Sequence, residues 1–243
     1  EEAQVNVASD IARQLVEYKE KGIPINAINF PALSGELMEE LGPYLSLSEK
    51  LGSFLSQMME GAITELKIEY SGEITQHNLG PLTVAILKGF FQSILEEDIN
   101  FVNAPLIAKE RGVKVTESKV SMTEDFTHLI SIQAHSKEGS LKVAGTLFSK
   151  KEPRLVRIGD FYLDAVPEGY MLVCSNLDRP GVIGKIGTIL GNHEINIAGM
   201  QVGRSSTQGE ALTVINVDSP VQEAVQAEIQ SIPEILKVKE ARL

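Results

Sequence analysis

The residues best placed to do chemistry form one short run, Asn176-Leu177-Asp178-Arg179-Pro180-Gly181, which joins an apolar stretch to a helical pattern. Backbone amides at a helix start carry partial positive charge and attract carboxylates. The Asp178 carboxylate beside them can accept hydrogen bonds from an ammonium group. A zwitterionic amino acid would suit this pair of features, although from spacing alone an ordinary turn and helix start is the commoner outcome.

Four glycines, at positions 181, 184, 187 and 191, run from this loop into the helical pattern. Their spacing is G-x-x-G-x-x-G rather than G-x-G-x-x-G, and no acidic residue follows about 20 positions later at the end of a second parallel strand. These two features argue against a dinucleotide-binding loop. We expect instead that the small residues let the helix pack closely against a sheet.

The other reactive side chains carry no catalytic or metal signature. The histidines at 77, 128, 135 and 193 are not at metal-ligand spacing with a carboxylate or with Cys174, and no serine or cysteine beside them has a nucleophile motif. Cys174 lies in an apolar stretch, where a buried and inert thiol is the usual case. We therefore expect no catalytic residue and no metal site in this chain.

Composition restricts the class of partner. A net charge of -11 over 243 residues would repel nucleic-acid phosphates. No segment is apolar over the roughly 18 residues that a membrane span needs. The single Cys174 cannot form an intramolecular disulfide, and the start lacks both an initiator Met and a secretory signal, which fits a cytoplasmic chain trimmed from a longer one. We expect neither nucleic acid nor a membrane as a partner.

The elements that would position the loop follow a regular order from residue 170 to residue 243. Apolar alternation predicts strands, and helical spacing predicts helices. The order is strand, helix, strand, strand, helix, strand, at 170–176, 181–192, 195–204, 211–217, 221–229 and 236–242. This βαββαβ order is typical of a ferredoxin-like domain, in which two helices cover one face of a four-stranded antiparallel sheet. The other face, or an edge, should be free to pair with a second copy.

The residues before this domain divide into a connector and a larger α+β domain. An apolar stripe from Val5 to Val16 predicts an amphipathic helix, and we assign residues 1–23 to a connector that packs on a preceding domain. Residues 24–165 should form a mixed-sheet domain. We expect a strand at 25–30, a helix capped by Ser48, helices at 82–95 and after Pro105, and antiparallel strands at 113–122, 128–135, 141–148 and 155–158. The predicted fold class is α+β.

The segment NLDRPGVIGKIGTILGNHEINIAGMQVGR, residues 176–204, resembles the ACT domain of the D-3-phosphoglycerate dehydrogenase family. Upstream, VNVASDIARQL resembles the last helix of that family's nucleotide-binding region. The segment from AINFPALSGE to about Asp164 resembles the intervening domain of the long form, an allosteric substrate-binding domain. The resemblance covers nearly the whole chain and implies the C-terminal regulatory part of such an enzyme: connector, intervening domain at 24–165, and ACT domain at 170–243.

The same resemblance implies a ligand and a partner. In this family L-serine, the end product of the pathway, binds between the ACT domains of two subunits and slows the dehydrogenase. Matched by motif, one subunit contributes the loop around Asp178 and the other contributes Asn196. The implied serine-binding residues are Asn176, Asp178, Arg179, Pro180, Gly181, Val182, Ile183, Asn196 and Ile197. The chain would form a homodimer or homotetramer through its ACT and intervening domains.

The family's catalytic residues lie outside this chain. The resemblance therefore implies no cofactor here and NAD in the catalytic part of the parent, which oxidises 3-phosphoglycerate at the first step of serine biosynthesis. Two alternatives stay open: a serine-insensitive oligomerisation module, and the regulatory part of an L-serine dehydratase. The latter enzyme uses an iron-sulfur cluster, which a lone Cys174 cannot ligate within this chain.

Overall fold

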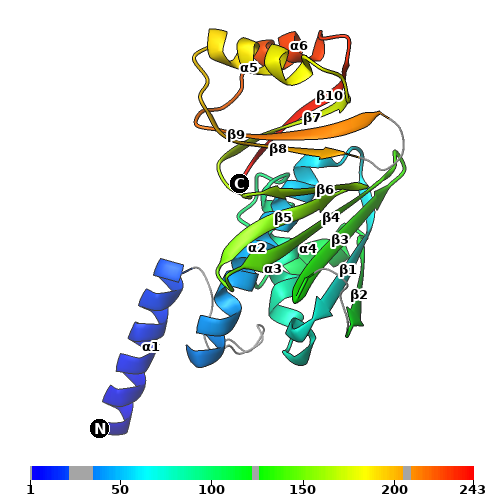
Figure 1. Ribbon diagram of the computed structural model, residues 1–243. Helices are drawn as coiled ribbons and strands as arrows, with labels where there is room; N and C mark the ends of the chain where they lie inside the picture. Colours follow the sequence, from blue (N-terminus) through cyan, green and yellow to red (C-terminus); the bar gives the residue numbers. More distant parts are fainter. Residues whose placement is uncertain (1, 22–34, 122–125, 205–208) are drawn as a thin grey trace.

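The computed structural model describes residues 2–21, 35–121, 126–204 and 209–243. A helix at the N-terminal end is followed by two domains stacked one on the other (Figure 1). One domain contains a six-stranded sheet and the other a four-stranded sheet, each with its own helices. This arrangement confirms the α+β fold class. The strand predicted at residues 25–30 lies outside the described residues.

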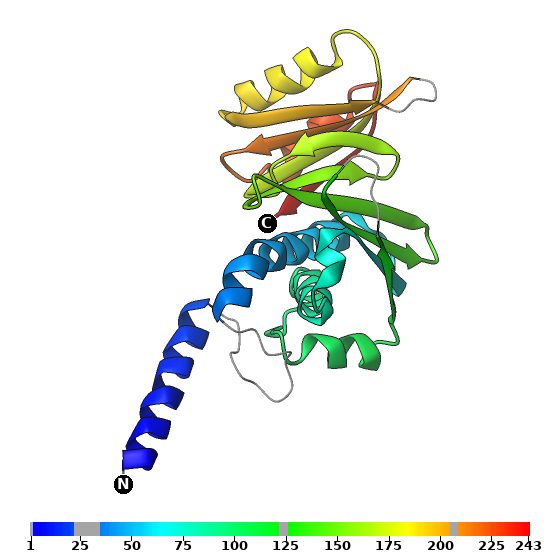
Figure 2. The same cartoon turned by 60° about the horizontal axis from the view of Figure 1, so that its bottom comes forward.

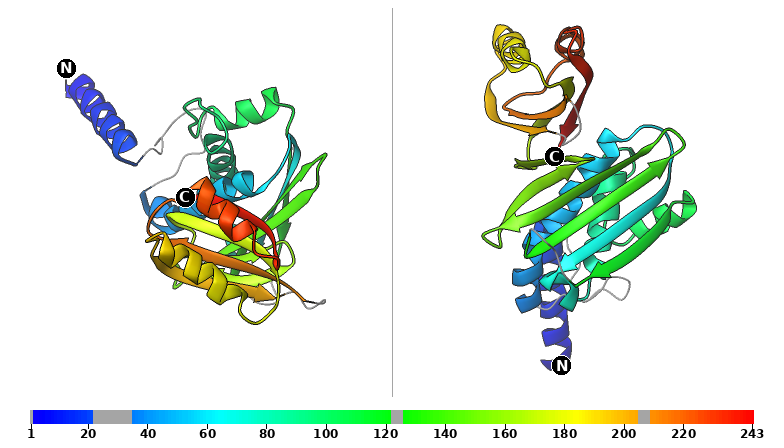
Figure 3. Two further views of the ribbon diagram at one scale, coloured as in Figure 1. Left: turned by 90° about the horizontal axis from the view of Figure 1, so that it is seen from above. Right: turned by 45° about the vertical axis from the view of Figure 1, so that its right-hand side comes forward.

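The first domain is a mixed sheet with helices on one face (Figure 3, right). The strand order is β2-β1-β3-β4-β5-β6. Buried Phe54, Tyr70 and Phe90 lie between the helices and the sheet. The elements are α2 (Gly35–Met58), β1 (Ile63–Gly72), η1 (Glu73–Gln76), α3 (Gly80–Gln92), α4 (Ala104–Glu110), β2 (Lys114–Val120), β3 (His128–Ser136), β4 (Ser140–Phe148), β5 (Glu152–Ile158) and β6 (Phe161–Ala165).

Helix α2 differs from its prediction because it begins at Gly35 rather than at Ser48, so the predicted start is wrong. Ser48 is buried in the middle of the helix, and its hydroxyl has no hydrogen-bond partner in the described part of the chain. Pro43 lies inside the helix, which costs a backbone hydrogen bond. Leu41 and Leu45 are buried on either side of this proline, so the apolar helical spacing continues through it.

Two further differences concern the ends of the six-stranded sheet. Strand β2 pairs in parallel with β1, so the predicted antiparallel pairing is wrong at this edge. Helices α3 and α4 lie between β1 and β2 in the sequence, and a helical crossover returns the chain in its original direction. At the other edge, β6 pairs with β5 where no strand was expected. This added strand faces the second domain.

The second domain has the predicted βαββαβ order. Its sheet is antiparallel throughout, in the order β10-β7-β9-β8, with both helices on one face (Figure 3, right). Buried Leu172, Ile186 and Ile215 belong to the core between helices and sheet. The elements are β7 (Tyr170–Leu177), α5 (Val182–Asn192), β8 (Ile197–Arg204), β9 (Glu210–Val217), α6 (Glu223–Gln230) and β10 (Ile235–Arg242). The ferredoxin-like prediction is confirmed.

The helix-free face of this second sheet is not open, contrary to one of the two options expected for it. Met171, Val173 and Val214 are buried in the same cluster as the core of the first domain. At the β10 edge, the Gln57 side chain exchanges hydrogen bonds with the Arg242 backbone at 2.9 and 3.0 Å. The Lys239 ammonium donates to the Met58 carbonyl at 2.9 Å. The face is therefore closed within the chain. Among the described residues, the outer side of β8 pairs with no other strand, although β6 packs closely on β8 at Gly203.

Helix α1 (Glu2–Lys21) forms where the apolar stripe predicts a helix and extends away from both sheets (Figure 2). Three of its apolar side chains, Val5, Ile11 and Leu15, are 52–63% exposed. The preceding domain on which we expect it to pack is still a prediction. In the described parts of the chain, no helix is both long and apolar enough to cross a membrane.

Candidate functional site

The candidate loop connects the end of β7 to the start of α5. Gly181, with φ 92°, turns the chain in a left-handed conformation that favours glycine. The Asp178 amide donates to the Gly209 carbonyl at 2.8 Å, and the Arg179 amide donates to the Leu177 carbonyl at 2.9 Å. The first bond ties the loop to the start of β9, and the second lies within the loop itself.

The first turn of α5 offers backbone donors next to Asp178. The Val182 amide makes only a long 3.4 Å bond to the Arg179 carbonyl. The amides of Ile183 and Gly184 have no acceptor among the described residues, as is usual at the start of a helix. The loop therefore combines a carboxylate with amides that can bind a carboxylate, which is the chemistry expected for a zwitterion.

A cation that the sequence analysis did not single out lies in this loop. Arg204, the last residue of β8, places its Nε 3.1 Å from the Asp178 Oδ2. The strand order contains the signal that could have found it. Strands β7 and β8 both run antiparallel to β9, so the two strands run in the same direction. The residues that follow or finish them lie at the same end of the sheet. Asp178 and Arg204 are those residues.

Asn176 lies beneath the loop rather than on its surface. It is 2% exposed, and its amide oxygen accepts a hydrogen bond from the Thr213 hydroxyl at 3.0 Å. Its amide nitrogen donates to the Leu177 carbonyl at 2.9 Å. Val182 is also buried, whereas Ile183, Pro180 and the rest of the loop are exposed. Asn176 thus supports the loop from the core, and its contact with a ligand stays a prediction.

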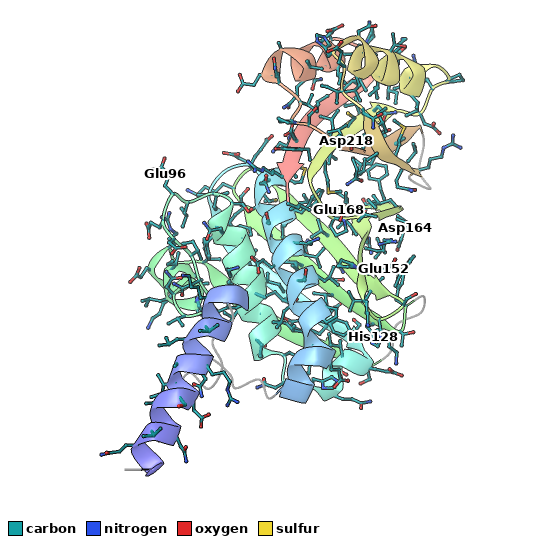
Figure 4. The ribbon with its side chains drawn as sticks, turned by 90° about the vertical axis from the view of Figure 1, so that its left-hand side faces the viewer. Glu96, His128, Glu152, Asp164, Glu168 and Asp218 are labelled. Atoms are coloured by element: carbon teal, nitrogen blue, oxygen red, sulfur yellow. The ribbon has the colours of Figure 1, made fainter. Side chains whose placement is uncertain are left out.

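Asn196 and Ile197 lie at the opposite end of the four-stranded sheet. Ile197 pairs with Val217, whereas Arg204 pairs with Ala211. At about 3.3 Å per residue, the length of β8 separates the two ends by about 23 Å. The Asn196 amide donates to the Asp218 carboxylate at 2.6 Å, and Figure 4 shows Asp218 in this second domain. One chain therefore does not bring Asn196 to Asp178.

The glycines of α5 face away from the sheet, so the predicted close packing is wrong. A Cβ added at Gly184, Gly187 or Gly191 would meet nothing within 4 Å. The buried side chains Ile186 and Leu190 face the sheet instead. At about 100° per residue, Gly187 and Gly191 each lie about 100° from the buried residue before them, and Gly184 lies about 160° from Ile186, so the glycines occupy one flank and the outer face of the helix.

The histidines and the cysteine add no second reactive centre. His77 lies 3.3 Å from Glu40 and His193 lies 2.7 Å from Glu228, each an exposed or half-buried pair. Burial lowers the pKa of His128, which lies at the end of its domain farther from the second domain (Figure 4). Burial also raises the pKa of the Cys174 thiol to about 12. In the described part of the chain, no group of three or more His, Cys, Asp or Glu side chains could hold a metal ion.

Two arginines near the domain junction, Arg154 and Arg157, already have carboxylate partners. Arg154 contacts Asp164 at 3.2 Å and Glu152 at 2.9 Å, and both carboxylates lie along this edge of the sheet (Figure 4). Arg157 lies 3.6 Å from Asp160 and stacks over the Tyr162 ring. These contacts give no evidence that Arg154 or Arg157 binds a phosphorylated substrate.

Comparison with known proteins identifies both domains. Residues 40–159 match the D-3-phosphoglycerate dehydrogenase intervening domain, and residues 170–234 match the ACT domain. The chain belongs to the D-3-phosphoglycerate dehydrogenase family. The two matched segments correspond to the six-stranded and the four-stranded domain, and from here we call these the intervening domain and the ACT domain.

Three relatives show the extent of the match. The chain is 38% identical to the D-3-phosphoglycerate dehydrogenase of Synechocystis sp. over 96% of its own length and 42% of that protein's. It is 38% identical to the enzyme of Archaeoglobus fulgidus, over 97% of this chain and 45% of that protein. It is 34% identical to the enzyme of Bacillus subtilis, over 98% and 45%. The chain thus spans less than half the length of these relatives, consistent with the expected C-terminal part.

Proposed function

We propose that this chain is the regulatory part of a D-3-phosphoglycerate dehydrogenase and that L-serine binds at its ACT domain as a feedback inhibitor. The observation that carries the proposal is the β7–α5 loop. Asp178 and the open amides of Ile183 and Gly184 there match the two charges of an amino acid. Oxidation of 3-phosphoglycerate with NAD would belong to the part of the relatives' length that this chain does not span.

The strand directions support a site shared between two copies. The outer side of β8 pairs with no other strand among the described residues, so β8 can pair with β8 of a second copy. A two-fold axis at the middle of β8 makes that pairing antiparallel. The Asn196 end of the second copy then lies beside the Arg204 end of the first, next to Asp178. One such dimer would hold two equivalent ligand sites.

We infer that the open flank of α5 lies on the same side as the β8 edge. On its other flank, Lys185 contacts Glu234 at 2.9 Å and His193 contacts Glu228, both residues of the α6 region. The flank with Gly184, Gly187 and Gly191 therefore points away from α6. Without side chains it lets a second α5 approach closely, so helix and strand together make one continuous surface for a second copy.

The test is a calorimetric titration of the chain with L-serine, with D-serine and glycine as controls, alongside its mass by sedimentation. We expect saturable, stereoselective binding to a dimer or larger species. Asp178→Asn removes the charge and keeps the shape, so it should weaken L-serine binding at least about tenfold. Thermal unfolding should stay unchanged. Unaltered affinity in Asp178→Asn would remove this carboxylate from the site.

A second candidate is an oligomerisation module that binds no amino acid. The free β8 edge and the open α5 flank favour it, because both would serve assembly without any ligand. This candidate predicts a dimer whose mass and stability do not respond to millimolar L-serine. The match to the intervening domain, meanwhile, favours a dehydrogenase over an L-serine dehydratase.

A further inference from the structure

Asp178, the carboxylate assigned to the ligand ammonium, already has a cationic partner in the chain. Arg204 contacts it through Nε at 3.1 Å, with the two side chains 72% and 32% exposed for Arg204 and Asp178. An arriving ammonium must therefore compete with a guanidinium for the same oxygen atoms. Exposed ion pairs of this kind are weak, so the competition does not close the site. The competition does mean, however, that only some ligands can bind with every charge at the site paired.

We propose that Arg204 is a specificity-determining residue that exchanges partners with the ligand. The ligand ammonium takes the Asp178 carboxylate, and the ligand carboxylate takes the released Arg204 guanidinium, a planar donor suited to bidentate contact with a carboxylate. The open amides at the start of α5 share that carboxylate. This inference rests on the proposed function and names its ligand class, a free α-amino acid.

Charge balance explains why only a zwitterion gains from this exchange. A simple amine that displaces Arg204 from Asp178 leaves the guanidinium without a partner. A simple carboxylate can bind Arg204 only by leaving Asp178 without one, or by joining a pair that is already neutral. An α-amino acid replaces one ion pair with two. The Asp178–Arg204 pair therefore selects against ligands that carry only one of the two charges.

The backbone of β8 is held up to Arg204 on two sides, so the exchange needs only a rotation of the Arg204 side chain. A Cβ added to the neighbouring Gly203 would lie 2.8 Å from the Tyr162 carbonyl oxygen of β6, which shows how closely the intervening domain packs on this strand. The ladder to β9 also continues up to the pair Arg204 and Ala211. Beyond Cα, however, the Arg204 side chain lies mainly in solvent.

The experiment compares three ligands by calorimetry on the full chain: L-serine, ethanolamine, which lacks the carboxylate, and 3-hydroxypropionate, which lacks the ammonium. The native chain should bind L-serine and neither analogue. Arg204→Gln should bind L-serine about tenfold more weakly, and its preference for L-serine over ethanolamine should fall at least about tenfold, because the variant no longer leaves a cation unpaired. Arg204→Lys should restore part of the preference.

Lys185→Ala is the matched control, since it removes another exposed cation of the ACT domain, one that pairs with Glu234 rather than with Asp178. It should leave both affinities unchanged, and circular dichroism should show all variants folded. Equal or tighter L-serine binding by Arg204→Gln with an unchanged preference would overturn the exchange and leave the amino-acid site standing. If neither the native chain nor Arg204→Gln binds L-serine, the amino-acid site itself is refuted, and the exchange with it.

Discussion

Two sets of helical glycines lie in opposite surroundings. In the intervening domain, a Cβ added to Gly89 of α3 would lie 2.0 Å from the Glu49 carbonyl oxygen of α2. A Cβ added to Gly52 of α2 would lie 2.1 Å from the Ile86 carbonyl oxygen of α3. In the ACT domain, a Cβ added to Gly187 of α5 would meet nothing within 4 Å. The first two glycines are required by a contact inside the chain, and the third is required by none.

The two edges of the ACT sheet differ in the same way. Strand β10 is held by the end of α2, through Gln57 and through the contacts of Lys237 and Lys239 with Glu60. The outer side of β8 pairs with no strand in the described part of the chain. Helical glycines and edge strands therefore each lie in closed surroundings in one place and in open surroundings in another. In the proposed dimer the second copy binds at both open surfaces, the glycine flank of α5 and the outer side of β8.

The largest expected effect tests the close contact between α2 and α3 at Gly89. Gly89→Ala forces α2 and α3 apart, because the new methyl group would overlap backbone atoms of α2. We expect a loss on the order of 3 kcal/mol in the free energy of unfolding, measured with urea. Gly187→Ala is the matched control and should instead gain roughly 0.5–1 kcal/mol from helix propensity. Equal stabilities in the two variants would break the comparison.

A smaller effect tests the open glycine flank of α5. Gly187→Leu adds a side chain where the single chain has space, so its fold should be kept. In the proposed dimer the same side chain would lie between the two α5 helices. We expect the dissociation constant of the dimer to rise at least about tenfold, or about 1.4 kcal/mol, by sedimentation equilibrium. Lys185→Leu, on the opposite flank of α5, should leave the constant unchanged. A dimer indifferent to Gly187→Leu would place the second copy elsewhere.

The ACT domain was predictable because its period changes cleanly between strand and helix. Its six elements begin and end within about two residues of their predicted bounds, the usual uncertainty of element ends. The intervening domain was less predictable from the sequence. The parallel pairing of β1 with β2 joins residues about 50 positions apart, and periodicity describes one segment without naming its neighbour. Pro43 inside α2 likewise needs the surrounding core to override a local helix-breaking signal.

The candidate site shows the same division. Asp178 and the helix start after Gly181 follow from local sequence, because a loop motif contains all of its own residues. Arg204 lies beside Asp178 only because β7 and β8 run in the same direction, which follows from the βαββαβ order and not from any motif. The α5 glycines were assigned to the wrong face, because a spacing of three or four residues fits any flank of a helix. Only the buried Ile186 and Leu190 identify the flank that meets the sheet.

The smallest expected effect concerns the closed β10 edge. Gln57 donates to the Arg242 carbonyl and accepts from the Arg242 amide, and so continues the edge of the ACT sheet into the intervening domain. Gln57→Ala leaves both backbone groups to water, so we expect a loss of about 1 kcal/mol in urea unfolding. Gln76→Ala, at the exposed last residue of η1, should cost less. Hydrogen exchange sharpens the test, because amides at the end of β10 should exchange faster in Gln57→Ala while those of β8 stay unchanged. If the β10 amides exchange as fast as the β8 amides in the native chain, and the variant changes neither rate, Gln57 does not close the β10 edge. A second copy would then have two edges on which to bind.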